Sequence, residues 1–512
     1  MAVVDQVGQR AGGRVPRTYG NWRRPQTAGL GALGMLGTLI LLVGMVVVIL
    51  TMMVVGWVQA LAVALVLLGF LGLLVFKDRH GRSGLVRIAG RVAAWRVRSA
   101  GAHLYRSGPL SRVPWGTFQL PGLLAASRLS EWRDSYGRPF ALLHVPATNH
   151  YSVVLATEPD GAALVDPEQV DAWVAAWGAW LNSLGSEPGL VAAAVTVESA
   201  PDSGARLRRE VAMNADPQAP ALAQAMLREV VEVYPEGSAT VRAWIALTFT
   251  GANRSTGRRK DDRQMGLELA SRLPGLTHAL HATGAGAARP ASAQELCEAV
   301  RIAYDPPAAR LIDAAHAAGE TTELGERLRW ADAGPVFAEA HRDCYLHDAA
   351  VSVTWTMTGA PRGVVQSGVL AQLLAPHREL DRKRVTLLYR PFDPARSARI
   401  AEQDKRNAEF KTTATNRPSA RVVAELRSTT ATAEEEARGH NLINFGLLVT
   451  ATVADVYRLP EATAAVDNLS ATARLQLRPA YGSQDSAFAA ALPLGLVLPA
   501  HSKVPAEIRE SL

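Results

Sequence analysis

Residues 25–76 read PQTAGLGALGMLGTLILLVGMVVVILTMMVVGWVQALAVALVLLGFLGLLVF, and none of these 52 residues is charged. A bilayer core about 30 Å thick is crossed by about 20 helical residues. The stretch is therefore too long for one span and long enough for two spans joined by a turn. We predict the first helix at residues 30–52 and the second at residues 58–76.

Cationic residues flank this stretch on both sides. Before it stand Arg10, Arg14, Arg17, Arg23 and Arg24, and after it stand Lys77, Arg79, Arg82, Arg87 and Arg91. Cationic flanks stay cytoplasmic, so an even number of spans is expected. We predict a multi-pass hairpin in the inner (plasma) membrane with both termini in the cytoplasm. A single span is the alternative, and it would leave one cationic flank outside.

The segment that follows the apolar stretch is basic. The whole chain carries +7, whereas residues 1–112 alone carry +12, so the remainder carries −5. We predict an amphipathic helix at residues 85–106, with Leu85, Ile88 and Val92 on its apolar face. Such a helix beside a span can lie in the lipid headgroup layer. The candidate membrane-surface residues are Arg87, Arg91, Trp95 and Arg98. An ordinary helix packed on the soluble part is the alternative.

Short apolar strands alternate with amphipathic helices after residue 112, which is typical of an α/β or α+β layered fold. The predicted strands are 140–145, 151–157, 191–197, 241–249, 351–357, 384–389 and 445–453. The predicted helices include 167–184, 220–233, 393–410, 420–438 and 460–474. We expect one or two cytoplasmic lobes. The predicted parts of the chain are a basic tail (1–24), the hairpin (25–76), the juxtamembrane helix (77–112), a first lobe (113–305) and a second lobe with a charged helical arm (306–512).

Three tryptophans share one face of the predicted helix at residues 167–184. They are Trp173, Trp177 and Trp180. Such a stripe can form a groove for a partner. Because each tryptophan removes a large apolar area from water when it is buried, we favour the interpretation that the stripe is part of the core.

The sequence contains no recognisable catalytic motif. A P-loop requires a lysine directly after a glycine, and none of the six lysines follows one. Gly29 to Gly34 match GxGxxG, but no strand precedes them and no acidic residue follows at the required distance. The histidines of residues 341–348 have no zinc-like spacing. Arg254 to Arg263 form a basic loop that either contacts phosphates or is simply solvated. We therefore predict no enzyme, no cofactor and no metal.

Together these features resemble an actinobacterial family of membrane proteins of conjugation-type (type IV) secretion. The apolar hairpin looks like the small PrgI-type inner-membrane subunit. The soluble part looks like the N-terminal, non-catalytic domain of the TraC/TrbE class of conjugation ATPases. The segments that carry this likeness are residues 385–391 (VTLLYRP), the charged arm, the strand near residues 445–453, and residues 481–488 (YGSQDSAF) with Leu492-Pro493.

The resemblance implies a non-enzymatic scaffold of a type IV-like secretion or DNA-transfer apparatus. Its partners would be the lipid bilayer, a separate secretion ATPase and other membrane subunits of the complex. One alternative is an EccE-like membrane subunit of type VII secretion, which also has a two-helix anchor and a cytoplasmic α/β domain. Another is a membrane-tethered enzyme or sensor with an unrecognised site.

Overall fold

A computed structural model gives the fold of the chain. It describes residues 2–3, 17–20, 22, 34–75, 84–108, 111, 120–159, 161, 164–202, 204–233, 239–253, 257–318, 328–361, 363–414 and 417–502. In these residues the chain forms fourteen α-helices and one large antiparallel sheet beside a small two-stranded ladder.

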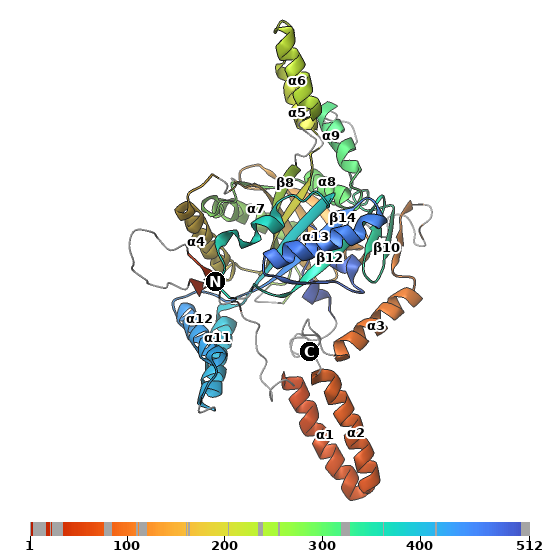
Figure 1. The fold of residues 1–512 in the computed structure, drawn as a ribbon, viewed down its shortest axis with the longest axis vertical. Coiled ribbons are helices and arrows are strands. Elements are labelled where there is room, and N and C mark those ends of the chain that lie inside the picture. The colour runs from red at the N-terminus through yellow and green to blue at the C-terminus, as the bar shows by residue number, and fades with distance from the viewer. Residues whose placement is uncertain are drawn as a thin grey trace.

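Two apolar helices, α1 (Gly34–Val54) and α2 (Trp57–Val75), form a hairpin that projects from the body (Figure 1). Gly56 makes the turn between them with a φ of 122°, a conformation that suits glycine. Both helices are long and apolar enough to cross a bilayer, as the uncharged stretch predicts. The predicted start of the first helix, residues 30–33, lies outside the described residues, as does Gly29 of the GxGxxG match.

The basic helix α3 (Gly84–Ser99) is shorter than predicted. It ends before Gly101, whose φ of 67° is left-handed and stops the helix. The predicted last turn is instead a strand, β3 (Leu104–Arg106), which pairs with β10 (Phe337–Ala340). The juxtamembrane segment therefore ends inside the main sheet.

The main sheet has thirteen strands in the order β3-β10-β11-β12-β14-β13-β7-β8-β6-β5-β4, with β15 beside β12 and β9 beside β6. From the first predicted lobe, residues 113–305, come β4 (Arg128–Arg133), β5 (Pro139–Val145), β6 (His150–Glu158), β7 (Leu190–Pro201), β8 (Ala239–Thr250) and β9 (Ala287–Pro290). From the second come β11 (Tyr345–His347), β12 (Ala350–Gly359), β13 (Arg382–Pro391), β14 (Ile443–Val453) and β15 (Gln476–Pro479).

Two stretches of the chain repeat the same topology. In residues 128–304, the first repeat, the sheet order is β4-β5-β6-β8-β7, and in residues 337–491, the second repeat, it is β10-β11-β12-β14-β13. When the strands are counted along the chain, each repeat has a pair of helices between its fourth and fifth strands. Each repeat also has a short additional strand that pairs with its third strand. The two repeats join where β7 pairs antiparallel with β13. A half-turn about an axis through this strand pair therefore relates them.

Hydroxyl pairs confirm the register of the repeats. On β6 and β8, Ser152 Oγ lies 3.0 Å from Thr248 Oγ1, and at the matching place on β12 and β14, Ser352 Oγ lies 2.7 Å from Thr452 Oγ1. A short sequence is also shared: Arg289-Pro290-Ala291 and Arg478-Pro479-Ala480. Pro290 lies opposite Leu155, and Pro479 lies opposite Trp355.

The helices cover the sheet in two layers. On one face a single core spans both repeats, under α8 (Ala293–Tyr304) and α14 (Gln484–Ala491). The other face carries one core for each repeat. The first lies under α4 (Pro167–Leu184) and α7 (Asp262–His278), and the second lies under α10 (Ala371–Leu374) and α13 (Leu459–Thr472). The sheet passes without a break from residues 113–305 to residues 306–512, so the predicted boundary separates two repeats within one sheet.

Two helical hairpins occupy the same place in the repeats. One is α5 (Ala205–Asn214) with α6 (Ala221–Val233), and the other is α11 (Pro394–Thr413) with α12 (Ala420–Ala437). They project from opposite sides of the body, with α5 and α6 farthest from α1 and α2 (Figure 1). The predicted charged arm is therefore a pair of packed helices, joined by Lys411 Nζ to Glu425 Oε1 at 2.9 Å.

Two of the three tryptophans of the α4 stripe pack into the core, as we favoured, whereas Trp173 is half-buried outside that core. Trp180 is buried under the first repeat, and Trp177 stacks on it with ring centroids 4.6 Å apart. Trp177 also meets Tyr389 of β13 edge-on. The α4 helix thus holds the two repeats together on this face of the sheet.

Candidate functional site

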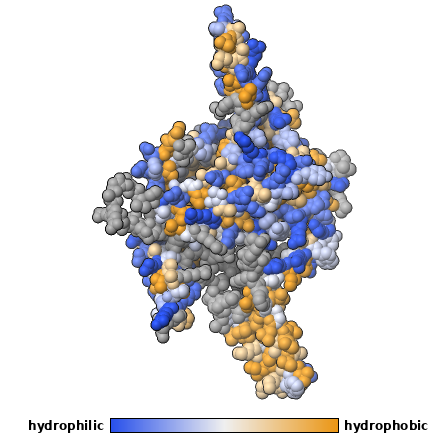
Figure 2. All heavy atoms as spheres, in the orientation of Figure 1, coloured by the Kyte–Doolittle hydropathy of each residue, from blue (hydrophilic) through white to orange (hydrophobic). Residues whose placement is uncertain are grey.

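The α1–α2 hairpin presents apolar side chains on all its visible sides (Figure 2). Its helices contain no charged residue, and Leu42, Val46 and Leu65 are each about half exposed or more. An apolar surface of this extent is not stable in water, so it marks an interaction with another apolar phase.

The predicted membrane-surface residues all lie on α3, next to α2 in the chain. Arg87, Arg91 and Arg98 are exposed on one face of the helix, and Trp95 is 68% exposed on a neighbouring face. Ile88 and Val92 lie beside Trp95 and are also exposed. The structure thus brings the four predicted residues together on an amphipathic helix whose apolar face the described part of the body leaves uncovered.

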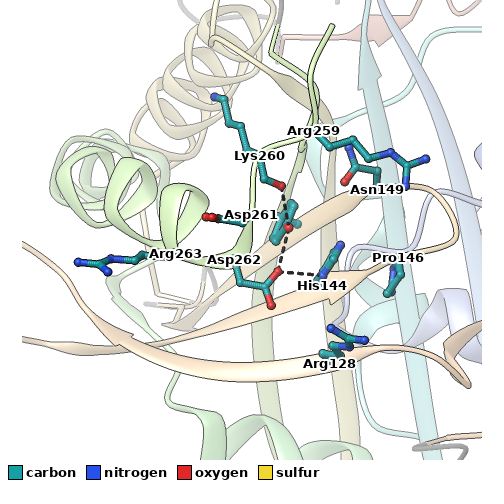
Figure 3. A pocket seen from close by; sticks show the side chains of 10 residues that line it. Arg128, His144, Pro146, Asn149, Arg259, Lys260, Asp261, Asp262 and Arg263 are labelled. Carbon is teal, nitrogen blue, oxygen red and sulfur yellow. Dashed lines mark hydrogen bonds and ion pairs between the residues drawn. The ribbon is translucent and has the colours of Figure 1, made fainter.

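A basic pocket of about 470 Å³ lies where the first turn of α7 meets β5 and β6 (Figure 3). Its lining is Arg128, His144, Pro146, Asn149, Tyr151, Arg259, Lys260, Asp261, Asp262 and Arg263. We call it the α7 pocket. Asp261 caps the helix by accepting a hydrogen bond from Gln264 N at 2.7 Å, and this cap fixes the position of the next residue, Asp262.

Asp262 organises the polar groups of the α7 pocket. Its Oδ1 lies 3.0 Å from His144 Nδ1 and accepts a hydrogen bond from the Tyr151 hydroxyl at 2.9 Å (Figure 3). The His144 and Tyr151 rings stack with centroids 4.2 Å apart. Both ring nitrogens of His144 are buried, and among the described residues neither has a hydrogen-bond partner of good geometry.

Burial and the neighbouring charges set the protonation of these groups. Burial lowers the pKa of His144; Asp262 opposes this, whereas Arg128 and Arg259 add to it. Burial, together with Asp262, raises the pKa of Tyr151. At neutral pH the histidine is therefore neutral and the tyrosine stays protonated.

The second repeat serves as an internal comparison for this pocket. At the matching register positions, His144 is replaced by Leu346, Tyr151 by Val351 and Arg128 by Glu339. The same fold is therefore built without these polar groups. Their presence in the first repeat is not needed for folding, which favours a function for them.

The α7 pocket has the chemistry of a binding site. Its lining contains no serine, threonine or cysteine, and the hydroxyl that it does contain, on Tyr151, donates a hydrogen bond to Asp262. Arg128 and Arg259 favour an anion in the pocket, and neutral His144 lies beside them. No group of three metal-ligating side chains occurs among the described residues.

The structure also shows the positions of the other residues that the sequence analysis considered. His347 is fully buried, where its Nε2 lies 2.8 Å from Ser352 Oγ, and His341 pairs with Glu339 at the surface. Of the basic loop, Arg259, Lys260 and Arg263 reach the lining of the α7 pocket, while Arg254 lies outside the described residues.

Sequence reasoning missed His144, Tyr151 and Asp262. His144 and Tyr151 belong to neighbouring predicted strands, and Asp262 lies in a segment predicted to be a loop. The signal that identifies them is the comparison of the two repeats, and it requires the register of the sheet.

Comparison with known proteins covers only the N-terminal part of the chain. Residues 26–86 match a family described as a domain of unknown function, DUF8461. This match contains the apolar hairpin and the start of α3. No curated protein matches the chain.

Proposed function

We propose that this chain is a membrane-anchored scaffold, held in the inner membrane by the α1–α2 hairpin, whose duplicated body docks other subunits of a secretion apparatus. The observation that carries the proposal is the hairpin itself. Its two helices carry no charged residue, many of their apolar side chains are exposed, and a large folded body follows them in the same chain. Lipid is the phase that such a surface fits.

Charge supports an orientation for the anchor. One cationic segment precedes the hairpin and another follows it, and the turn at Gly56 is uncharged. Under the positive-inside rule, both chain termini and the body lie in the cytoplasm, and the turn faces outside. In this arrangement α3 lies against the inner leaflet, with Arg87, Arg91 and Arg98 at the headgroups and Trp95 at the acyl boundary.

The class of partner comes from the resemblance to type IV secretion components. In that proposal the body holds a separate secretion ATPase at the membrane and has no motor of its own. The absence of a lysine that follows a glycine agrees with this role. No catalytic step is assigned to the scaffold.

Affinity purification of the full chain from its native membranes in mild detergent tests the scaffold. The proposal expects an ATPase with a P-loop and a polytopic channel protein among the co-purified proteins, in amounts comparable with the bait. Residues 1–112 alone serve as the matched control, because they keep the anchor and α3 without the body. Equal recovery of the ATPase with this control, or none with the full chain, contradicts the proposal.

The same experiment separates the two secretion systems. Co-purification of a mycosin-type protease and small WxG substrates would instead identify an EccE-like subunit of type VII secretion. The genes beside the coding sequence offer an independent comparison of the same two possibilities.

A membrane-tethered enzyme or sensor is the second candidate, and the α7 pocket favours it. His144 has a buried, unpaired Nε2 beside two arginines, which is more than a passive scaffold requires. A thermal-shift screen of the full chain with nucleotides and metals tests this candidate. A shift that His144→Gln abolishes would support it, and no shift with any compound would oppose it.

A further inference from the structure

A second, larger groove lies where β7 and β14 end and β8 and β13 begin. This is the edge of the sheet opposite the one that carries the α7 pocket. Its volume is about 1320 Å³. The helices α5 and α9 (Ala308–Ala318) form its walls, so we call it the α5–α9 groove. Both helices lie on the side of the body away from the α1–α2 hairpin (Figure 1).

A buried cluster of charges lies beside the sheet floor of this groove. Glu198 of β7 pairs with Arg382 and also accepts a hydrogen bond from Arg384 Nε at 2.9 Å. Both arginines come from β13 and carry two positive charges against one negative charge. Burial alone would raise the pKa of Glu198, but the two arginines hold it at about 2, so Glu198 is ionised. The cluster therefore keeps a net positive charge inside the protein.

The hydrogen-bonding groups of the cluster are incompletely satisfied, and Nη1 of Arg384 has no partner among the described residues. Arg382 lines the groove and is only 9% exposed, yet its Nε has no hydrogen-bond partner among the described residues. An unpaired donor of a buried charged group is costly, because the group loses its hydration without a replacement. A bound anion would balance the net positive charge of the cluster.

The internal repeat shows that the fold does not need these charges. Across the half-turn, Glu198 corresponds to Leu388, Arg384 to Ala194 and Arg382 to Ala192. Ala194 and Leu388 lie directly opposite each other on β7 and β13, as do Glu198 and Arg384. The same sheet position is thus filled by apolar residues in one place and by ions in the other. Because apolar residues usually serve stability at least as well as a buried ion cluster, the ions indicate a binding role.

More arginines surround the opening of the groove. Arg209 of α5, Arg242 of β8 and Arg310 of α9 line it, and in the described part of the chain none of the three has a side-chain partner. The acidic side chains of the lining are engaged elsewhere. Asp381 pairs with Arg458, Asp202 accepts a hydrogen bond from Gly204 N, Asp313 interacts with another group, and Glu198 belongs to the cluster.

We propose that the α5–α9 groove binds a soluble small molecule that carries a phosphate or diphosphate group. The phosphate oxygens would accept hydrogen bonds from Arg242 and Arg310, because guanidinium groups match phosphate geometry, and the charge of Arg382 beneath them would attract the anion. Arg209 would join from α5 and tie the projecting α5–α6 hairpin to the sheet. The proposal is independent of the scaffold role, since it rests on the groove alone.

Calorimetric titration of the full-length protein in nanodiscs at low salt tests the site. The probes are inorganic phosphate, pyrophosphate and ATP, with hexaglutamate to represent an acidic protein segment. We expect saturable binding of pyrophosphate or ATP to one site per chain. Stronger binding of ATP than of pyrophosphate would add a nucleoside to the ligand. No saturable binding of a phosphate probe, or stronger binding of hexaglutamate than of any of them, would overturn the proposal.

Substitutions locate the binding. Arg242→Gln and Arg310→Gln lie at the surface and should each weaken binding about tenfold, the usual effect of losing one charge-assisted hydrogen bond. Arg228→Gln on α6 is the matched control, because it lies on the projecting hairpin outside the groove lining, and Arg128→Gln tests the α7 pocket. Neither should change the affinity. If Arg128→Gln abolished binding and Arg242→Gln left the affinity unchanged, the assignment to the α5–α9 groove would be overturned.

A second readout does not depend on the affinity. Ligand binding should slow hydrogen exchange of the α5 backbone, because Arg209 would be held against the sheet. The α11–α12 hairpin, which has the same place in the second repeat, serves as the internal reference. Equal slowing in both hairpins, or in neither, would contradict a ligand held between α5 and the sheet.

Discussion

Thr196 and Thr386 face each other across the central strand pair β7–β13, with their Oγ1 atoms 3.2 Å apart. The two repeats are arranged about this contact. On the neighbouring strands β8 and β14, Thr248 and Thr452 occupy matching positions. Thr248 pairs with Ser152 of β6, and Thr452 pairs in the same way with Ser352 of β12. Positions related by this half-turn can be compared directly, and where they differ in polarity, the polar member is a candidate for function.

The charge cluster at Glu198 offers the clearest test of the comparison between the two repeats. Glu198→Gln leaves Arg382 and Arg384 buried without a counter-charge, so we expect a loss of about 3–5 kcal/mol in the free energy of unfolding. The triple variant E198L/R382A/R384A copies the apolar residues of the related positions and should recover most of this loss. Denaturant unfolding of the detergent-solubilised protein measures both. A triple variant as unstable as the single one contradicts the comparison of the repeats.

Lys383 should make stability depend on alkaline pH. Burial lowers its pKa from 10.5 to about 8, and its Nζ donates to the Ala375 carbonyl. Between these pH values the unfolded chain binds a proton that the folded protein does not, so stability rises with pH. Lys383→Met should remove this rise and stabilise the protein at pH 7 by no more than about 3 kcal/mol. An unchanged slope in thermal unfolding between pH 8 and 10 would count against the buried lysine.

The sequence predicted the elements of the fold better than their arrangement. The hairpin followed from an uncharged stretch of 52 residues, and strands such as β12 followed from strict alternation. These signals are local. The pairing of β7 with β13 joins residues far apart in the chain, and little of the shared sequence besides Arg-Pro-Ala marks the repeat. The division into lobes was therefore placed between repeats of one sheet.

The candidate sites were less predictable for the same reason. The residues on α3 were found because they lie close together at helical spacing. In the α7 pocket, His144 and Asp262 come from elements more than a hundred residues apart, and each looks ordinary in its own segment. Their relation depends on the capped start of α7, which the sequence placed within a loop.

The His144 ring should report the charges of the α7 pocket. Asp262 is the neighbour that raises its pKa against the effect of burial, whereas Arg128 lowers it. Asp262→Asn should therefore lower the pKa of His144 further, and Arg128→Gln should raise it. NMR titration of the histidine ring measures both directions. If the two substitutions shift the pKa the same way, the described electrostatics are wrong.

Trp95 should lie at the membrane surface. A cysteine in its place, carrying an environment-sensitive dye, should be quenched by nitroxide groups attached to the upper acyl chain of the lipid. The same dye at Arg98, on the basic face of α3, is the matched control and should be quenched less. Strong quenching at neither position would show that α3 is held away from the bilayer, as an ordinary helix of the body would be.

The side of the membrane on which the body lies decides the account as a whole. Cysteine placed at Gln59, beside the turn of the hairpin, should react with a membrane-impermeant maleimide in intact cells, while a cysteine added after Leu512 should react only once the cells are opened. Cys297 is buried, and Cys344, on the body, should also stay unlabelled in intact cells. This pattern is the one that a cytoplasmic scaffold on a two-span anchor predicts. Labelling of the C-terminal cysteine in intact cells would contradict it.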